Sequence, residues 1–370
     1  MHKKLIIIGT FLCLSISSPA QAAVSIDNFN ARVPIHVYSQ GNLIPTGLSP
    51  DQVKLAYHLP TTGGSGTIAI IAAYSDQTIE KDLNIFSRQF GLPDCTTVNG
   101  CLEIHKMSPT TGHDSGWALE TSLDVEWAHA IAPKAKILLM QASTASGRRL
   151  MEAVDYARTR RDLVAISMSW GGPEFADEVN MEDHFTSPYG ATFFASSGDN
   201  GWGVSWPASS KNVVAVGGTR LNFSAAGRFS SETAWSGSGG GVSAYLPQPD
   251  FQSQYNISRA HGHRAIPDVS YNADPASGFS VYSSSPGSAA KSGWYVLGGT
   301  SAGAPQWAAI KSLGLSAGNA KFYQDKSGPN NKNYFRDIIS GANGDCKYYC
   351  EARKRYDYVT GLGSPLTANY

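Results

Sequence analysis

Continuous apolar runs alternate along the chain with segments of helical periodicity, and this alternation limits the folds that are available to it. The runs are rich in Ile, Val and Ala, as expected of strands that are buried on both faces. Strands of that kind separated by helices predict an α/β fold with a doubly wound, mainly parallel sheet flanked by helices. The length allows one large domain or two smaller ones, and we expect a single large domain. The predicted strands cover 67–72, 136–141, 163–167, 191–195 and 213–216, and the predicted helices cover 79–90, 117–131, 148–160 and 176–185.

One long segment does not follow this alternation. Residues 228–292 are richer in Gly, Ser and Pro, and the segment carries the run Ser-Gly-Ser-Gly-Gly-Gly at 236–241. We expect it to form long, irregular surface loops beside the functional site and not a separate domain. Sheets of this architecture place their ligand sites at the carboxyl ends of the strands, so the functional residues are expected there.

The first 22 residues have the three-part pattern of a secretory signal peptide. Lys3 and Lys4 precede an apolar stretch at 5–16, which is too short to span a bilayer comfortably, and 20–22 reads Ala-Gln-Ala. We therefore expect a secreted or periplasmic protein. Residues 23–46 would form a short N-terminal segment ahead of the main domain at 47–370. With 29 basic and 29 acidic side chains, the charge balance indicates neither a nucleic-acid partner nor a membrane surface.

Five cysteines are present, and Cys13 would leave with the signal peptide. An exported context and short separations favour the disulfides Cys95–Cys101 and Cys346–Cys350, although four cysteines permit three pairings. Metal ligation is the competing interpretation. It is disfavoured because neither pair has the two-residue spacing or the histidine partner of a zinc site.

Ser301 stands out as a candidate nucleophile. It lies in the sequence Gly-Thr-Ser-Ala-Gly at 299–303, between a short apolar strand and a helical run. A serine at such a corner lies at a helix N-terminus, where backbone N–H groups stabilise negative charge. A helix-capping serine is the simpler interpretation of this position. The motif also fits the nucleophile elbow of α/β-hydrolases, but those enzymes need a histidine after the serine, and none of the nine histidines follows Ser301.

Carboxylic acids offer a different base. Glu120 and Asp124 are four residues apart on a predicted helix that is apolar for its length, so they share one helix face. A buried pair of this kind shares protons and titrates as a unit, whereas on a solvated face it would have no special role. Asp199 follows an apolar strand within Ser-Ser-Gly-Asp, either in an ordinary turn or at the carboxyl end where this fold builds its sites.

Together these segments resemble the sedolisin, or serine-carboxyl peptidase, family over nearly the whole chain after residue 22. Any one of the matching motifs is weak, but their number and order are specific. The resemblance implies a subtilisin-like fold in which a glutamate replaces the histidine base. The matching segments are 45–57, 117–133, 167–172, 196–199, 267–270, 298–301 and 360–365.

The resemblance also implies roles for four residues. Ser301 would attack the scissile carbonyl, Glu120 would take its proton, and Asp124 would orient Glu120. Asp199 would stand in the oxyanion hole with the backbone N–H of Ser301, and it must carry a proton to donate a hydrogen bond there. Activity is therefore expected at acidic pH and should fall towards neutrality.

Two further sites follow from the resemblance. The stretch Ser169, Trp170, Gly171 and Gly172 is similar to the one that lines the family's substrate cleft, where a backbone edge could pair with an extended peptide; core packing is the alternative for Trp170. A structural Ca²⁺ site is implied near the C-terminus, where two carboxylates and several carbonyls would supply the oxygen ligands. This sequence has arginine at two positions where the family usually has glycine. The implied calcium ligands are Asp337, Ile338, Arg353, Arg355 and Asp357.

These observations predict a monomeric serine peptidase that acts on polypeptides, either inside a chain or by releasing N-terminal tripeptides. A catalytically inactive relative that binds peptides or a partner protein is the alternative from another class. A third interpretation is a subtilisin-type triad that uses His113 or His129. It fits less well, because His129 lies more than two helical turns beyond Glu120.

Overall fold

The computed structural model describes residues 25–285, 291–314, 318–327 and 334–366. The predicted signal peptide and Cys13 lie outside these residues. The main sheet has eight strands in the order β10-β9-β7-β5-β2-β4-β3, with β13 also paired to β9; all pairs are parallel except β10 with β9. The strands are β2 (Thr67–Ala73), β3 (Leu102–Lys106), β4 (Lys136–Ala142), β5 (Leu163–Met168), β7 (Thr192–Ser196), β9 (Val213–Phe223), β10 (Phe229–Ala234) and β13 (Val269–Asn272).

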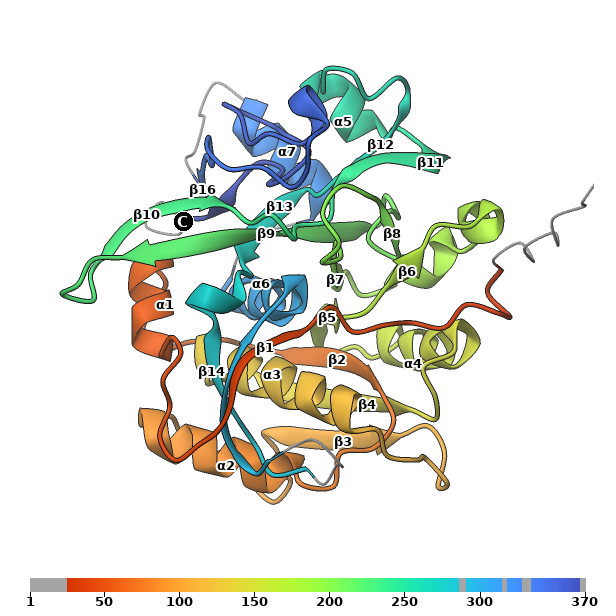
Figure 1. Ribbon diagram of the computed structural model, residues 1–370. Helices are drawn as coiled ribbons and strands as arrows, with labels where there is room; N and C mark the ends of the chain where they lie inside the picture. The colour runs from red at the N-terminus through yellow and green to blue at the C-terminus, as the bar shows by residue number, and fades with distance from the viewer. Residues whose placement is uncertain (1–24, 286–290, 315–317, 328–333, 367–370) are drawn as a thin grey trace, which may run out of the picture.

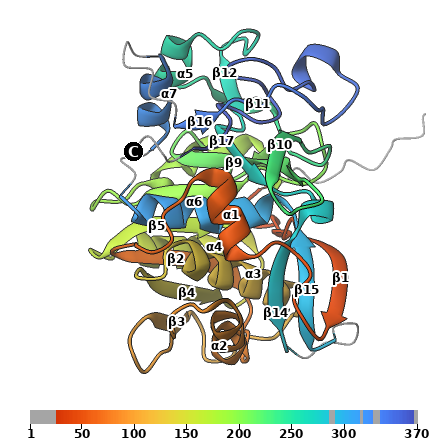
Figure 2. The ribbon, with the colours of Figure 1, turned by 90° about the vertical axis from the view of Figure 1, so that its left-hand side faces the viewer.

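Helices flank this sheet (Figures 1 and 2). Two of them, at Ser115–Ile131 and Gly303–Ser312, are buried over most of their length. Helix α3 is apolar around most of its circumference because it is enclosed by the sheet, by α6 and by α2. Helix α4 packs on β2, β4 and β5. The helices are α1 (Pro50–Tyr57), α2 (Ile79–Phe90), α3 (Ser115–Ile131), α4 (Gly147–Arg158), α5 (Asp250–Tyr255), α6 (Gly303–Ser312) and α7 (Asn319–Ser327).

A second, three-stranded sheet brings the N-terminal segment onto the molecule. Strand β1 (His36–Asn42) pairs antiparallel with β15 (Gly293–Gly298), and β15 pairs antiparallel with β14 (Phe279–Ser283). Before β1, the chain crosses in front of the main sheet near β5, as the red trace in Figure 1 shows. The remaining short strands are β6 (Gly172–Pro173), β8 (Ser205–Trp206), β11 (Gly241–Pro247), β12 (His263–Ile266), β16 (Phe335–Arg336) and β17 (Ser364–Pro365).

The expectation of irregular loops across residues 228–292 is wrong. The described part of this segment holds β10, β13 and β14 in the two sheets, and it also holds β11, α5 and β12. Its strands pair with β9, with β15 or with each other, so pairing orders this segment despite its Gly and Pro content. The predicted helix at 176–185 is present only as two 3₁₀ turns, Ala176–Asn180 and Glu182–Phe185. This stretch contains two Asp residues and one Asn, which favour turns and caps over helix interiors.

The two disulfides, Cys95–Cys101 and Cys346–Cys350, form as predicted. Among the described residues, no helix has both the length and the apolar character needed to cross a membrane.

Candidate active site

Ser301 lies where the chain passes from β15 into α6, as the sequence predicts. A single 3₁₀ turn, Thr300–Ala302, joins the two elements, and the serine is fully buried. Gly299 has φ of 124°, and a Cβ atom there would lie 2.0 Å from the main-chain oxygen of Pro34. Only glycine permits this close approach.

Glu120 and Asp124 lie on α3, which begins after Asp114; one carboxylate oxygen of Asp114 accepts from the N–H groups of Gly116 and Trp117, each at 3.0 Å. Both catalytic candidates on this helix are only 1% exposed. The Ser169 hydroxyl lies 2.8 Å from Asp124 Oδ1 and 3.1 Å from the carbonyl oxygen of Ser301. The Ser169 hydroxyl thus links Asp124 on α3 to the turn that holds Ser301.

The electrostatics connect the serine with the carboxyl pair. Burial raises the pKa of Glu120 well above its ordinary value, Asp124 raises it further, and Ser301 lowers it. Burial also raises the pKa of Asp124, while hydrogen bonds from Ser169 and Glu120 lower it. Ser301 and Asp124 are thus close enough to shift Glu120, although its two oxygens accept no hydrogen bond of good geometry from the described residues. Such a buried pair retains a shared proton, because both carboxyls cannot ionise together.

Asp199 follows the end of β7 and contacts the serine turn through Thr300. Its Oδ1 accepts from the N–H and the hydroxyl of Thr300 at 2.8 and 2.7 Å. Its Oδ2 lies 3.2 Å from Nε2 of His36. Burial raises the pKa of Asp199, and His36 and Thr300 lower it; the hydrogen bond to Asp199 in turn raises the pKa of His36 against the effect of desolvation.

The N-terminal segment occupies the space in front of this site. The Ser301 hydroxyl donates a 2.7 Å hydrogen bond to the carbonyl oxygen of Pro34. Upstream of Pro34, the extended chain is paired on both edges: Arg32 exchanges two main-chain hydrogen bonds with Gly171, at 2.9 and 3.0 Å, and the N–H of Ala31 donates to the carbonyl of Ala145. A cavity of about 660 Å³ remains beside the segment, bounded by Gly171–Pro173 and by residues 196–201.

Pro34 and His36 are site residues that the sequence analysis does not identify. No local pattern marks them, because they reach the site from a different part of the chain through pairing with β15 and Gly171. The glycines at 171, 172 and 299 are the available signal, since runs of glycine indicate positions where another backbone approaches closely.

The predicted substrate-binding stretch divides into two parts. Gly171 and Gly172 line the cleft beside the N-terminal segment. Trp170 is fully buried, and its indole N–H donates to the carbonyl of Ile71, so it packs in the core beneath the cleft. Ser169 faces Asp124 and not the cavity.

The residues predicted to bind calcium form one compact group. Asp337 Oδ2 accepts from the N–H of Arg355, and Asp357 Oδ2 accepts from the N–H of Arg353. Asp337 Oδ1 is buried without a hydrogen-bond partner among the described residues, which fits a carboxylate awaiting a cation. Arg355 has φ of 71°, a left-handed conformation that glycine adopts more easily. Burial raises the pKa of Asp357 to about 7. The main chain of Ile338 follows directly on Asp337.

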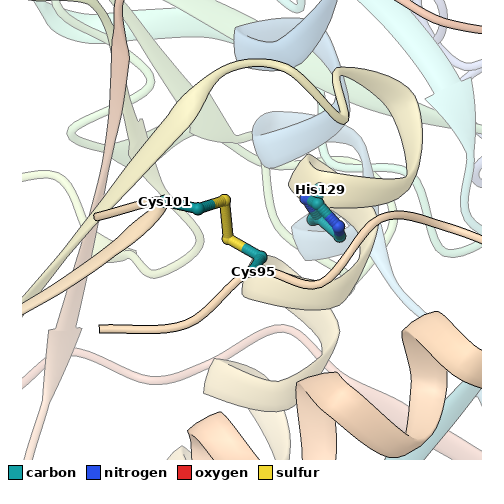
Figure 3. A group of neighbouring side chains, drawn as sticks. All are labelled: Cys95, Cys101 and His129. Atoms are coloured by element: carbon teal, nitrogen blue, oxygen red, sulfur yellow. A yellow bond between two sulfur atoms is a disulfide. The ribbon is translucent and has the colours of Figure 1, made fainter. Parts of the chain in front are cut away.

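The two histidines considered for a triad, His113 and His129, contact main-chain carbonyls. His129 Nε2 lies 2.8 Å from the carbonyl of Pro93, and the ring lies beside Cys95 and Cys101 (Figure 3). The two sulfur atoms are bonded to each other, so this trio has no thiolates for a metal. His113 Nδ1 lies 3.1 Å from the carbonyl of Ser75. Among the described histidines, His36 is the one that contacts Asp199.

Comparisons with known proteins agree with this geometry. The profile of the Subtilase family matches residues 111–330. Kumamolisin from Bacillus sp. (strain MN-32) is 33% identical over 362 residues, covering 87% of this chain and 62% of kumamolisin. Sedolisin from Pseudomonas sp. (strain 101) is 29% identical over 372 residues, covering 86% of this chain and 60% of sedolisin. The chain therefore spans about six-tenths of the length of these relatives. The solved structure of Pseudomonas sedolisin, a serine-carboxyl proteinase complexed with pseudo-iodotyrostatin, superposes with a TM-score of 0.73 at 27% identity, over 88% of this chain and 96% of that chain.

Proposed function

The chain belongs to the subtilase family and, within it, to the sedolisins, and from this we propose that it is an exported serine-carboxyl peptidase that hydrolyses polypeptides. The observation that carries the proposal is the pose of residues 31–34. An extended polypeptide lies in the cleft with one edge on Gly171 and presents a carbonyl to the Ser301 hydroxyl. A bound substrate would pair with the cleft in the same way.

In the first step, Ser301 Oγ attacks the scissile carbonyl carbon while Glu120 takes the hydroxyl proton. The hydroxyl now points at Pro34, so it must turn towards Glu120 before the attack. Asp124 shares a proton with Glu120, and Ser169 holds Asp124 in place. The singly protonated pair therefore provides one carboxylate as the base. Return of the proton to the leaving amine then gives the acyl-enzyme on Ser301, which water hydrolyses.

The negative oxygen of the intermediate would be stabilised by the N–H of Ser301 and by Asp199. Thr300 holds Asp199 Oδ1, so the proton that Asp199 would donate to the oxyanion sits on Oδ2, the oxygen that lies 3.2 Å from His36 Nε2 in this structure. Burial raises the pKa of Asp199 and favours that neutral form. Because an ionised Asp199 would repel the oxyanion, the proposed enzyme is most active at acidic pH and loses activity as Asp199 releases its proton.

We include one structural Ca²⁺ in the proposal. Asp337 and Asp357 would supply carboxylate oxygens, and the main-chain carbonyls of Ile338, Arg353 and Arg355 would complete the oxygen set. Oδ1 of Asp337, which accepts no hydrogen bond from the part of the chain that the structure describes, supports this assignment. The ion would hold the turn at 353–357 against the strand end at Asp337.

Digestion of an unstructured protein at pH 3–5, with products identified by mass, tests the function. We expect the wild-type protein to cleave it, and we expect Ser301→Ala to lower kcat by about 10⁴-fold or more while the thermal unfolding transition is retained. Equal cleavage by both proteins would contradict the role of Ser301. Peptide binding without cleavage by either protein would favour the inactive, peptide-binding relative.

A further inference from the structure

The cleft continues well past the residues that pair with Gly171. Upstream of Arg32, the segment remains extended against the loop before α4. Asn30 forms an antiparallel bridge with Ser146, and the carbonyl of Phe29 accepts from the N–H of Gly147 at 2.9 Å. Phe29 lies five residues before Pro34, the residue whose carbonyl faces Ser301. The non-primed side of the cleft therefore holds six consecutive residues of an extended chain.

Phe29 fills an aromatic pocket at the far end of this path. Its ring lies edge-on to Trp206 at a centroid distance of 4.9 Å, and it is tilted against Phe175 at 5.9 Å. Phe29 is only 2% exposed, and both partner side chains are buried. These are the separations and orientations at which aromatic pairs attract one another.

Gly172 creates the room for that ring. A Cβ atom at Gly172 would lie 2.7 and 2.8 Å from two ring carbons of Phe29, and its three nearest neighbours all belong to Phe29. The backbone at Gly172 is not in the left-handed region, so its conformation does not require glycine. A methyl group at this position would thus collide with the occupant of the pocket and with little else.

Resting on the proposed peptidase function, we infer that this pocket is a substrate subsite that binds a large apolar or aromatic side chain five residues before the residue that donates the scissile carbonyl. The enzyme is accordingly an endopeptidase. A tripeptidyl-peptidase has no use for a cleft that continues three residues beyond the end of its product. In the structure, the chain's own Phe29 takes the place of the substrate side chain.

Pro34 would protect the segment from attack while it lies in the cleft. Proline has no N–H to donate to the cleft and has a fixed φ. It is therefore a poor residue at the point of attack. A test peptide needs a different residue there, so that the upstream subsite is measured on a bond that can be cut.

The experiment compares two 15-residue peptides with blocked ends. Both carry the sequence of residues 26–40 with Pro34→Leu, and the second also carries Phe29→Ala. Three forms of the full chain are assayed at pH 4: Phe29→Ala, which vacates the pocket, Phe29→Ala with Gly172→Ala, and Phe29→Ala with Gly318→Ala. The variant with Gly318→Ala is the matched control, since a methyl group at Gly318 meets no atom of the described residues within 4 Å.

The readout is the ratio of kcat/KM for the two peptides, which cancels differences in the amount of active enzyme. Burying a phenylalanine ring predicts a preference of about tenfold or more for the Phe peptide with the Phe29→Ala enzyme. The ratio should fall towards one with Gly172→Ala and persist with Gly318→Ala. If Phe29→Ala fails to fold, the two peptides are compared on Gly172→Ala and Gly318→Ala in the otherwise unchanged chain, where the peptide must first displace Phe29 from the pocket; the ratio should again be higher with Gly318→Ala.

Two results overturn the subsite alone: a ratio near one in every form, or faster cleavage of a free-ended peptide that begins at position 32 and yields only a tripeptide. In both cases cleavage still depends on Ser301, so the peptidase proposal stands. No cleavage of any peptide by any form would overturn the peptidase proposal, and the subsite with it.

Discussion

Asp199 is the residue at which the proposed chemistry and the N-terminal segment meet. Thr300 orients one of its oxygens, and His36 lies beside the other. The same carboxyl can therefore be an ionised partner of His36 or a neutral donor to an oxyanion, but it cannot be both at once. Replacement of Asp199 separates these two states.

We predict that Asp199→Ala lowers kcat by about 10²–10³-fold, which corresponds to the loss of one oxyanion donor. Asp199→Asn should retain more activity, because its amide can accept from Thr300 and still donate towards the substrate. Steady-state kinetics at the pH optimum, with near-ultraviolet circular dichroism as a check of the fold, would test this. Equal losses in the two variants would show that hydrogen-bond donation is not the role of Asp199.

His36 should set the upper limit of the active pH range. It lowers the pKa of Asp199, so His36→Ala should raise that pKa and keep the protonated form to higher pH. We therefore predict that the basic limb of the kcat/KM profile moves to higher pH. His105→Ala is a suitable control, since that ring stacks on Tyr156 instead. An unmoved limb would mean that another group governs the loss of activity.

The acidic residues of the site could be predicted from the sequence, whereas the residues contributed by the N-terminal segment could not. Glu120 and Asp124 stand out because a four-residue spacing on an apolar helix forces two carboxyls together, and Asp199 because it follows a buried strand. No local sequence pattern predicts that Pro34 and His36 lie at the site. Their place depends on strand pairing with partners more than 130 residues away.

Residues 29–42 form two consecutive extended stretches with different pairing partners. The first part pairs with the cleft at residues 145–147 and 171, and the second part pairs with β15, which leads into Ser301. The peptide bond after Pro34 lies at the junction. We expect Pro34 to disfavour attack on this bond.

We predict that Pro34→Leu makes this bond cleavable, because leucine restores the N–H and relaxes φ. Incubation of the variant at pH 4 should give a new N-terminus at Ile35, detected by intact mass and N-terminal sequencing. The rate should not depend on protein concentration if each chain cuts itself. Pro34→Leu combined with Ser301→Ala should remain whole; cutting of that double variant would point to a contaminating protease.

Helices and strands whose own sequence determines them could be predicted, whereas strands that depend on pairing with another segment could not. The helix at 79–90 and the strands at 67–72 and 136–141 were predicted to within a residue at each end, because each is a long apolar or amphipathic run. Strand β9 was predicted only over its first four residues, since Gly217 and Gly218 interrupt the apolar run there. Strands β10 and β13 were missed because pairing with β9 stabilises them, and their own composition does not.

In the whole molecule, the site is formed by segments that lie far apart in the sequence. The N-terminal segment, α3, the end of β5, the end of β7 and the turn before α6 all converge at Ser301. The last described residues also return to the sheet: the main chain of Gly363 accepts from Ser270 on β13. The predicted calcium site lies in this returning region, so we expect the ion to affect the stability of the fold and not the chemistry.

We predict that calcium raises Tm at neutral pH. A ligand that binds only the folded state stabilises it by about 2.7 kcal/mol when its free concentration is 100 times Kd. Asp337→Asn should abolish this response, because it removes the buried carboxylate whose Oδ1 has no hydrogen-bond partner among the described residues. Without calcium, the variant should be about as stable as wild type, because the amide oxygen of asparagine can still accept from the N–H of Arg355. Asp325→Asn, on α7, provides a carboxylate control outside the site. Calorimetry with and without calcium, together with metal analysis of the purified protein, would measure these effects; an equal rise in Tm for Asp337→Asn would place the ion elsewhere.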